Sequence, residues 1–305
     1  MSRADDAAGG RTFLAPAKLN LFLHVTGRRA DGYHLLQTAM RMVDLGDALT
    51  VAVRDDGTIV RAGDVPGVAP DDDLTIRAAR LLRGEAGVAS GATIALRKVV
   101  PMGGGLGGGS SDAAIVLLAL NRLWGVGWPR ARLATLGARL GADVPFFVHG
   151  RDAFVEGIGE RITPIDLPEA HYVIVHPGVG VPTAAIFGAS ELTRNRAPIK
   201  IADFSTAGSG SAGSIDVDFG TTVNDLEPVA TARFPAVREA LAWLTDERFA
   251  GASGPARMSG SGACVFRAFD RASAAAAVAA RVPGGWSAWS VRSLASHPDA
   301  AWFGP

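Results

Sequence analysis

The sequence is organised around one glycine-rich stretch, Pro101-Met-Gly-Gly-Gly-Leu-Gly-Gly-Gly-Ser-Ser-Asp112. Residues 92–100 before it are typical of a strand, and residues 113–124 after it are typical of a helix. Its six glycines lack the Cβ atoms that keep a ligand away from the backbone. Ser110 and Ser111 stand where a helix N-cap is expected. A glycine loop that ends on a helix N-terminus presents free N–H groups, so the stretch predicts a binding site for an anion, most often phosphate.

The loop differs from the common nucleotide-binding loops. A Walker A loop ends in Gly-Lys-Ser/Thr, but no lysine lies between Pro101 and Asp112. The pattern G-x-G-x-x-G fits Gly103, Gly105 and Gly108, but it arises almost automatically in so glycine-rich a run. A dinucleotide fold requires a strand after the helix, whereas a second helical stretch follows here, and the H-R-D and D-F-G motifs of protein kinases are absent. A flexible turn is the alternative, although linkers seldom join a strand to an apolar helix.

Length and composition favour a cytoplasmic α/β or α+β protein. The 305 residues suffice for one large or two moderate domains, and 30 basic residues balance 30 acidic ones. This balance argues against nucleic acid or an anionic membrane as the main partner. Cys264 is the single cysteine, which excludes an internal disulfide and fits a reducing compartment. No run of about 18 apolar residues occurs, and residues 1–10, with Asp5 and Asp6, are expected to form a disordered tail rather than a signal peptide.

A lysine interrupts an apolar strand near the N-terminus. Residues 13–25 alternate with period two, which places Lys18 and Asn20 on one face, about 7 Å apart. A lysine in such a strand is either a functional group or a charge that protects an edge strand from aggregation.

Asp143 is the second candidate for chemistry. Residues 128–140 carry leucines at helical spacing, and Gly141 is placed to end that helix. Asp143 then precedes Pro145, which fixes the chain, and its neighbours are apolar. We therefore expect a rigidly held, partly buried carboxylate, with an exposed Asx-type turn as the alternative.

The remaining pattern mixes helices with short strands. Tyr33 and His34 follow a turn at Asp31-Gly32, where they either face a ligand or form a packed corner. The Ser/Gly-rich residues 203–220 are expected to form a long mobile loop, and residues 258–266 form a second small-residue loop that enters a strand. The other expected elements are strands at 49–53, 152–156, 161–164, 171–176 and around Trp289, and helices at 72–82, 183–191, 222–244 and 271–281.

Together, two glycine/serine loops, a strand lysine and a rigid aspartate indicate phosphoryl transfer. This chemistry requires that the phosphates be held, the developing charge be neutralised and the attacking hydroxyl be positioned. The loop can hold the phosphates, and Asp143 can accept the hydroxyl proton or orient it. Lys18 can keep this carboxylate ionised and attract the γ-phosphoryl group.

Other chemistries lack their motifs. No G-x-S-x-G surrounds any serine of the two loops. The six histidines include no H-x-x-x-H pair, and a lone cysteine excludes a thiolate zinc site. Cys264 begins an apolar strand, where a small buried thiol is expected rather than a nucleophile.

With these residues the chain resembles the GHMP kinases of small molecules. Four pieces carry the resemblance: Pro16-Ala-Lys-Leu-Asn-Leu-Phe-Leu-His24 with Gly32-Tyr-His34; residues 101–111; Gly141-Ala-Asp-Val-Pro145 with Glu156-Gly-Ile-Gly-Glu160; and Ser259-Gly-Ser-Gly-Ala-Cys264. The first piece is similar to the branch that phosphorylates the 2-hydroxyl of a cytidine diphosphate-linked methylerythritol in the non-mevalonate isoprenoid pathway. Homoserine, mevalonate and galactose kinases lack that opening.

The resemblance implies two small-molecule substrates in one cleft. Lys18 and Asp143 would be catalytic, and the cytidine diphosphate-linked polyol would contact Asn20, Tyr33, His34, Thr183 and Phe187, with its pyrimidine stacked between aromatic rings. Mg²⁺ would accompany the nucleotide, with Ser111 or Asp112 as a candidate contact. ATP, the co-substrate, would lie on Pro101, Gly103, Gly104, Gly105, Leu106, Gly107, Gly108, Gly109, Ser110 and Ser111.

The resemblance also implies an α+β fold of two lobes. Residues 11–160 would form a ribosomal protein S5 domain 2-like lobe that carries the ATP loop, and residues 161–305 a ferredoxin-like lobe. Two alternatives stay open: a sister kinase with another alcohol substrate, which has no reason to bind CMP, and a non-enzymatic nucleotide-binding relative, against which Lys18 and Asp143 argue. The sequence shows no heptad or self-complementary stripe, so a monomer and a weak homodimer are both open.

Overall fold

The computed structural model describes residues 10–201 and 222–304. The tail expected at 1–10, except for its last residue, and the loop expected at 203–220 lie outside these described residues. Within them, eleven strands join into one sheet. The strands are β1 (Arg11–Asn20), β2 (His24–Arg28), β3 (His34–Arg54), β4 (Ile59–Ala62), β5 (Gly91–Arg97), β6 (Ala153–Gly157), β7 (Arg161–Pro164), β8 (His171–His176), β9 (Arg257–Met258), β10 (Val265–Phe269) and β11 (Ser287–Leu294).

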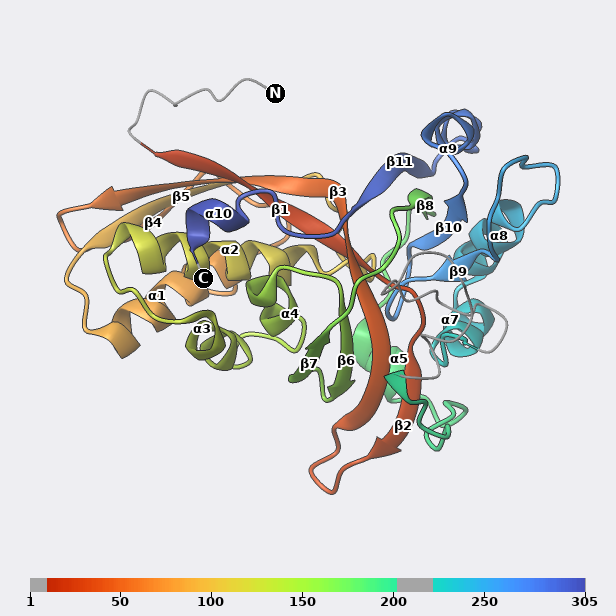
Figure 1. Ribbon diagram of the computed structural model, residues 1–305, viewed down its shortest axis with the longest axis horizontal. Helices are drawn as coiled ribbons and strands as arrows, with labels where there is room; N and C mark the ends of the chain where they lie inside the picture. Colours follow the sequence, from red (N-terminus) through yellow and green to blue (C-terminus); the bar gives the residue numbers. More distant parts are fainter. Residues whose placement is uncertain (1–9, 202–221, 305) are drawn as a thin grey trace.

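The helices lie in two groups beside the sheet (Figure 1). Helices α1 to α4 cover the strands β1, β3, β4 and β5, while α7 to α9 lie beside β8 to β11. The α+β class predicted from the sequence is confirmed. The helices are α1 (Leu74–Ala86), α2 (Gly108–Leu123), α3 (Arg130–Gly137), α4 (Val144–His149), α5 (Thr183–Phe187), α7 (Glu227–Arg233), α8 (Pro235–Leu244), α9 (Ala272–Ala279) and α10 (Ala300–Phe303).

The long strand β3 is the spine of the sheet, because β1, β2, β5, β6 and β11 all pair with it. The single strand expected over residues 13–25 is wrong, since it breaks between β1 and β2. At the break, Leu23 N–H donates to the Val223 carbonyl and Asp225 N–H donates to the Leu23 carbonyl. A segment 200 residues away in the sequence therefore bends the chain where local alternation predicts a continuous strand.

The core has three hydrophobic clusters. The first packs α1 to α4 against the strands around β3, and α2 runs through it with residues 111–121 all buried. The second lies among α5, α7 to α9 and the C-terminal strands, and the third joins the two at β1, β8 and β10. Strand β11 pairs with both β8 and β3, and α10 then packs by Phe303 against Phe13, so the chain returns to its N-terminal half. The boundary proposed at residue 160 stays a prediction.

Several elements match their sequence patterns closely. Helix α1 begins after Asp73, whose side chain accepts the N–H of Thr75, strands β7 and β8 occupy the expected ranges, and β6 lies one residue later than expected. No helix within the described ranges has the length and apolar character that a membrane span requires.

Candidate active site

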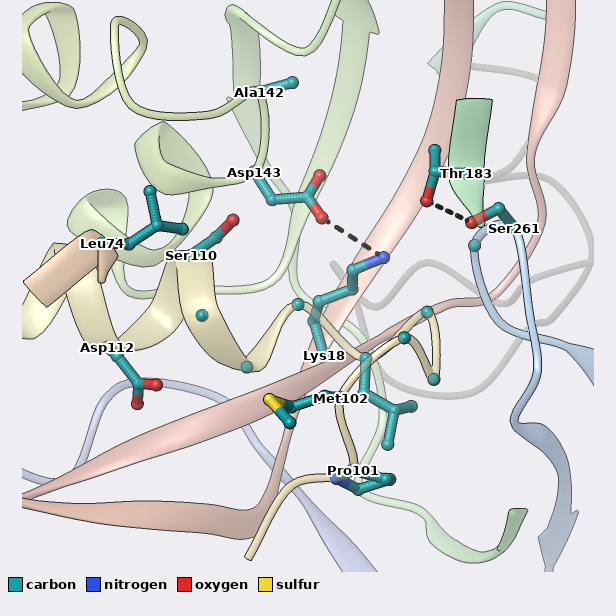
Figure 2. Close-up of a pocket in the computed structure, with 18 of the residues that line it drawn as sticks. Lys18, Leu74, Pro101, Met102, Ser110, Asp112, Ala142, Asp143, Thr183 and Ser261 are labelled. Carbon is teal, nitrogen blue, oxygen red and sulfur yellow. Dashed lines mark hydrogen bonds and ion pairs between the residues drawn. The ribbon is translucent and has the colours of Figure 1, made fainter. Parts of the chain in front are cut away.

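A cavity of about 560 Å³ opens beside the glycine loop (Figure 2). Its wall contains the two catalytic candidates, Lys18 and Asp143, and three of the substrate candidates, Asn20, Thr183 and Phe187. It also contains Pro101, Gly103, Gly104, Gly105, Leu106, Gly107, Gly108, Gly109, Ser110 and Asp112. Among the described residues, the wall does not include Ser111, Tyr33 or His34. These residues come from four separate parts of the sequence and meet at one site.

The helix after the loop begins earlier than expected. Helix α2 starts at Gly108, and its N-cap is Gly107, with φ 71°, so the N-cap predicted at Ser110 or Ser111 is wrong. The left-handed backbone of Gly107 turns the chain into the helix, and Ser111 N–H already donates to the Gly107 carbonyl over 2.9 Å. Both serines therefore lie inside the first turns of α2, which leaves the backbone N–H groups of the loop at the helix entrance.

The loop turns its carbonyl groups toward the protein. Gly103 O accepts N–H groups from Val181 and Ala263, and Gly104 O accepts that of Cys264 over 3.0 Å. The Gly105 carbonyl accepts a hydrogen bond from the Ser259 hydroxyl over 3.1 Å. The Leu106 carbonyl accepts one from the backbone N–H of Lys18 over 2.9 Å. Within the described residues no N–H of residues 103–107 is hydrogen-bonded. Donors without partners beside a helix N-terminus suit an anion such as phosphate.

Gly105 has no room for a side chain. Its φ is +73°, and a Cβ would lie 2.1 Å from the Ser259 carbonyl oxygen, which is backbone and cannot rotate away. We expect Gly105→Ala to lower the free energy of unfolding by about 1–3 kcal/mol and to raise the KM for ATP, because the loop must shift. Denaturant unfolding and initial rates measure the two effects.

The matched control is Gly84→Ala in α1, where no atom lies within 4 Å of the added Cβ. It is expected to leave the KM for ATP unchanged and to stabilise the helix by about 0.5–1 kcal/mol. An unchanged ATP KM in Gly105→Ala would show that ATP does not require the loop geometry described above.

Lys18 and Asp143 face each other across the cavity (Figure 2). The Lys18 Nζ lies 3.5 Å from Asp143 Oδ2, and the exposed fractions of the two side chains are 4% and 30%. Asp143 stands at the N-cap position of α4, but its side chain accepts no capping hydrogen bond. The carboxylate is thus held by its backbone, directed at the ammonium group and still open to a ligand.

The local structure around Asp143 differs from the expected one. Helix α3 ends at Gly137, before the predicted end at residue 140, and a short helix, α4, follows Asp143. Pro145 at the start of α4 is the signal that could have revealed it, because proline is favoured in the first turn of a helix.

Asn20 and Lys18 lie on one face of β1, as the period-two pattern predicts. Lys18 Nζ donates to Asn20 Oδ1, and Asn20 Nδ2 donates to Thr38 Oγ1 over 2.9 Å. The backbone N–H of Asn20 donates to Ser259 Oγ over 3.2 Å. All four residues are buried, so the ammonium group is fixed by a network and not by a flexible stem.

The second small-residue loop also reaches the cavity. Thr183 Oγ1 and Ser261 Oγ lie 2.8 Å apart, so α5 and this loop are linked at the cavity wall. The Ser-Gly-Ser-Gly pattern predicts this loop, but it does not predict a role for Ser259 or Ser261. Cys264 is fully buried there, and burial raises the pKa of its thiol well above the ordinary value, which agrees with the expected inert thiol.

Lys98, which the sequence pattern does not single out, holds the chain in place just before the glycine loop. Lys98 Nζ lies 2.5 Å from Asp47 Oδ2 and 2.8 Å from Asp112 Oδ2, and Asp47 also accepts the N–H groups of Val99 and Val100. Burial raises the pKa of Asp112 to about 7, against the lowering effect of Lys98. Asp112 thus ties α2 to the strand that precedes the loop.

The aromatic candidates lie at the β2–β3 turn and at the end of α5. The rings of His34 and Phe187 have centroids 5.1 Å apart, while Tyr33 in the same turn is 62% exposed. Arg194 Nε donates to His34 Nε2 over 3.0 Å. Burial, followed by the charges of Arg194 and Arg28, lowers the pKa of His34, so its imidazole is neutral at pH 7.

Comparison with known proteins covers both halves of the chain. Residues 73–151 match the GHMP kinases N terminal domain, and residues 207–288 match the GHMP kinases C terminal domain. The 4-diphosphocytidyl-2-C-methyl-D-erythritol kinase of Aromatoleum aromaticum is 54% identical over 290 residues, 95% of each chain. That of an Azoarcus species is 55% identical over 284 residues, 93% of this chain and 94% of its own. A crystal structure of 4-(cytidine 5'-diphospho)-2C-methyl-D-erythritol kinase is 35% identical, with a TM-score of 0.77 over 92% of this chain and 98% of its own.

Proposed function

The chain belongs to the 4-diphosphocytidyl-2-C-methyl-D-erythritol kinases of the GHMP kinase family, and we propose that it transfers the terminal phosphoryl group of ATP to the 2-hydroxyl of that substrate. It is a small-molecule kinase. The observation that carries the proposed chemistry is the Lys18–Asp143 pair, which lies in the wall of the same cavity as the glycine loop.

Each part of the cavity has a task in the transfer. The loop N–H groups hold the ATP phosphates, and the Lys18 ammonium neutralises charge on the transferred group. Asp143 takes the proton of the substrate hydroxyl or orients it. The hydroxyl oxygen forms a bond to the γ-phosphorus, the bond from phosphorus to the bridging oxygen breaks, and ADP leaves. The acceptor is a tertiary alcohol, so positioning matters more than base strength.

The alcohol substrate is recognised by residues outside the glycine loop. Asn20 and Thr183 line the wall near Lys18, where they can contact the polyol hydroxyls. The pair of His34 and Phe187 offers aromatic surface to the cytosine, and Tyr33 in the adjacent turn is exposed enough to close over it.

The residues present fit Mg²⁺ bound together with the nucleotide. No three His, Cys, Asp or Glu side chains come together as a metal site in residues 10–201 and 222–304. Mg²⁺ commonly needs only one or two protein oxygens beside substrate phosphates. Ser111 Oγ and Asp112 Oδ1 are both buried without a hydrogen-bond partner among the described residues, so both are candidate ligands. Asp112 lines the cavity, with its Oδ2 paired to Lys98, whereas Ser111 does not line it. The ion would neutralise charge between the β- and γ-phosphates.

An ATP-consumption assay tests the proposed function. Turnover is expected with 4-diphosphocytidyl-2-C-methyl-D-erythritol and not with homoserine, mevalonate or galactose. Calorimetric titration with CMP is expected to show binding, which a sister kinase has no reason to show. Turnover of another alcohol without CMP binding would replace the proposed substrate, and ATP binding without any turnover would leave a nucleotide-binding protein.

Tyr33→Ala is expected to weaken binding of the cytidylate end by about 1–3 kcal/mol, the value of stacking one base on an aromatic ring. The KM for ATP should stay unchanged, because Tyr33 does not lie on the glycine loop. Tyr33→Phe keeps the ring and should retain CMP affinity, as measured by titration calorimetry. A higher KM for ATP in Tyr33→Ala, with CMP affinity intact, would contradict this division of the cavity.

A further inference from the structure

Thr38 in β3 connects the Asn20 side chain to the backbone. Asn20 Nδ2 donates to Thr38 Oγ1 over 2.9 Å, and Thr38 Oγ1 donates to the Phe22 carbonyl oxygen over 2.5 Å. Asn20 and Thr38 are each only 1% exposed. Water is therefore excluded from the link, and each hydrogen bond must be made within the protein.

The polarity of this link is fixed by the carbonyl group, which can only accept a hydrogen bond. The Thr38 hydrogen is committed to Phe22, so the hydroxyl oxygen is left to accept from the Asn20 amide nitrogen. The amide oxygen then faces the other way, toward Lys18, and accepts from its ammonium group. The opposite orientation would set the amide N–H groups against the ammonium group and the amide oxygen against a hydroxyl oxygen that has no hydrogen left to donate.

We propose that Thr38 is a positioning residue that fixes the Asn20 amide, and through it the Lys18 ammonium group, for phosphoryl transfer. The proposal rests on the role of Lys18 in the proposed function. A lysine has four side-chain bonds about which it can rotate, and here Nζ is held from one side by Asn20 and faces Asp143 at 3.5 Å on the other.

The same asparagine also joins the lysine to the glycine loop. Asn20 N–H donates to Ser259 Oγ, and Ser259 Oγ donates to the Gly105 carbonyl over 3.1 Å. Thr38 therefore acts on the alignment of Lys18 with the loop that holds the phosphates. Its own hydroxyl is already used by Asn20 and Phe22, so the expected effect is on turnover and not on ATP affinity.

Thr38→Val tests the proposal, because valine keeps the shape and removes the hydroxyl. We expect kcat per active site to fall about tenfold, as for the loss of a buried hydrogen bond in a network, with the KM for ATP unchanged. Thr38→Ser restores the hydroxyl and should recover kcat. Thr50→Val, on the same strand, removes a hydroxyl that pairs with exposed Thr12 Oγ1 and should leave kcat unchanged. Thermal unfolding of each variant checks the fold, and Thr38→Ala replaces Thr38→Val should the latter not fold.

A double-mutant cycle with Asn20→Ala separates positioning from a general structural role. In the Asn20→Ala background, Thr38→Val is expected to cause no further fall in kcat, because the side chain on which it acts is gone. Multiplied effects, an unchanged kcat in Thr38→Val, or a change in the KM for ATP alone would overturn the proposal. Lys18→Met is measured in parallel. Wild-type kcat in Lys18→Met would refute the proposed role of Lys18, whereas a defect there beside a normal Thr38→Val would refute only the role of Thr38.

Discussion

Asp143→Asn is expected to lower kcat by about a thousandfold, in the range that a general base contributes, while ATP binding is retained. Asparagine has the same shape but cannot accept the proton of the substrate hydroxyl. The Asp143 side chain is 30% exposed and caps no helix, so its replacement leaves no buried unpaired group at α4. Single-turnover kinetics measure the chemical step, and fluorescence titration with an ATP analogue measures binding.

The matched control is Asp299→Asn, since Asp299 also stands before a short helix, α10, and makes no side-chain capping hydrogen bond. It lies near Arg11 and not in the cavity wall, so its kcat should equal that of the wild type. A wild-type rate for Asp143→Asn would show that the transfer does not need this carboxylate.

The parts of the site that depend on local rules could be predicted from the sequence. Period two alone places Lys18 and Asn20 on one face, and the structure joins them by a hydrogen bond. The glycine loop between a strand and an apolar helix can also be predicted from its local sequence. The residue at which α2 begins cannot be predicted in this way, because Gly107 in a left-handed conformation competes with the serines for the N-cap position. Which of them caps the helix depends on the contacts of the loop with Lys18 and Ser259.

Other features depend on partners that are distant in the sequence. The sequence pattern predicts a strand only at residues 49–53, whereas β3 runs from His34 to Arg54. In the structure its pairing with β1 shifts between Gly46 and Val43, so the intervening residues form an irregularity inside one continuous strand. Asp47 is buried there because Lys98 and two backbone N–H groups satisfy its carboxylate. No local pattern distinguishes such an aspartate from one in an exposed turn.

The Lys18–Asp143 distance also depends on distant partners, since 125 positions separate the two residues and the packing of both β1 and α4 against α2 brings them together. The resemblance to the GHMP kinases implied roles for both residues, whereas periodicity and spacing could not place them within reach of each other. From the 3.5 Å contact we expect Lys18 and Asp143 to act as one functional pair.

Lys18→Met is expected to lower kcat about a hundred- to a thousandfold, as for the loss of one group that stabilises transition-state charge. Methionine fills most of the buried space of the lysine stem, which is 4% exposed, and the remaining Asp143 carboxylate is open enough to stay solvated. Stability should therefore change less than the rate, which thermal unfolding and single-turnover kinetics measure side by side.

The double variant of Lys18→Met and Asp143→Asn decides whether the two residues act as one unit. Groups that act together give effects that are far from additive, because the first change already removes what the second would remove. We expect the double variant to be about as slow as the more damaged single variant. If the two rate losses multiplied instead, Lys18 and Asp143 would act independently, and the contact at 3.5 Å would be a structural ion pair beside two separate functions. If the double variant loses no more rate than one single variant, the charge of Lys18 is coupled to the proton transfer at Asp143. The structure predicts this result, because Asn20 holds the ammonium group on one side and Asp143 faces it on the other.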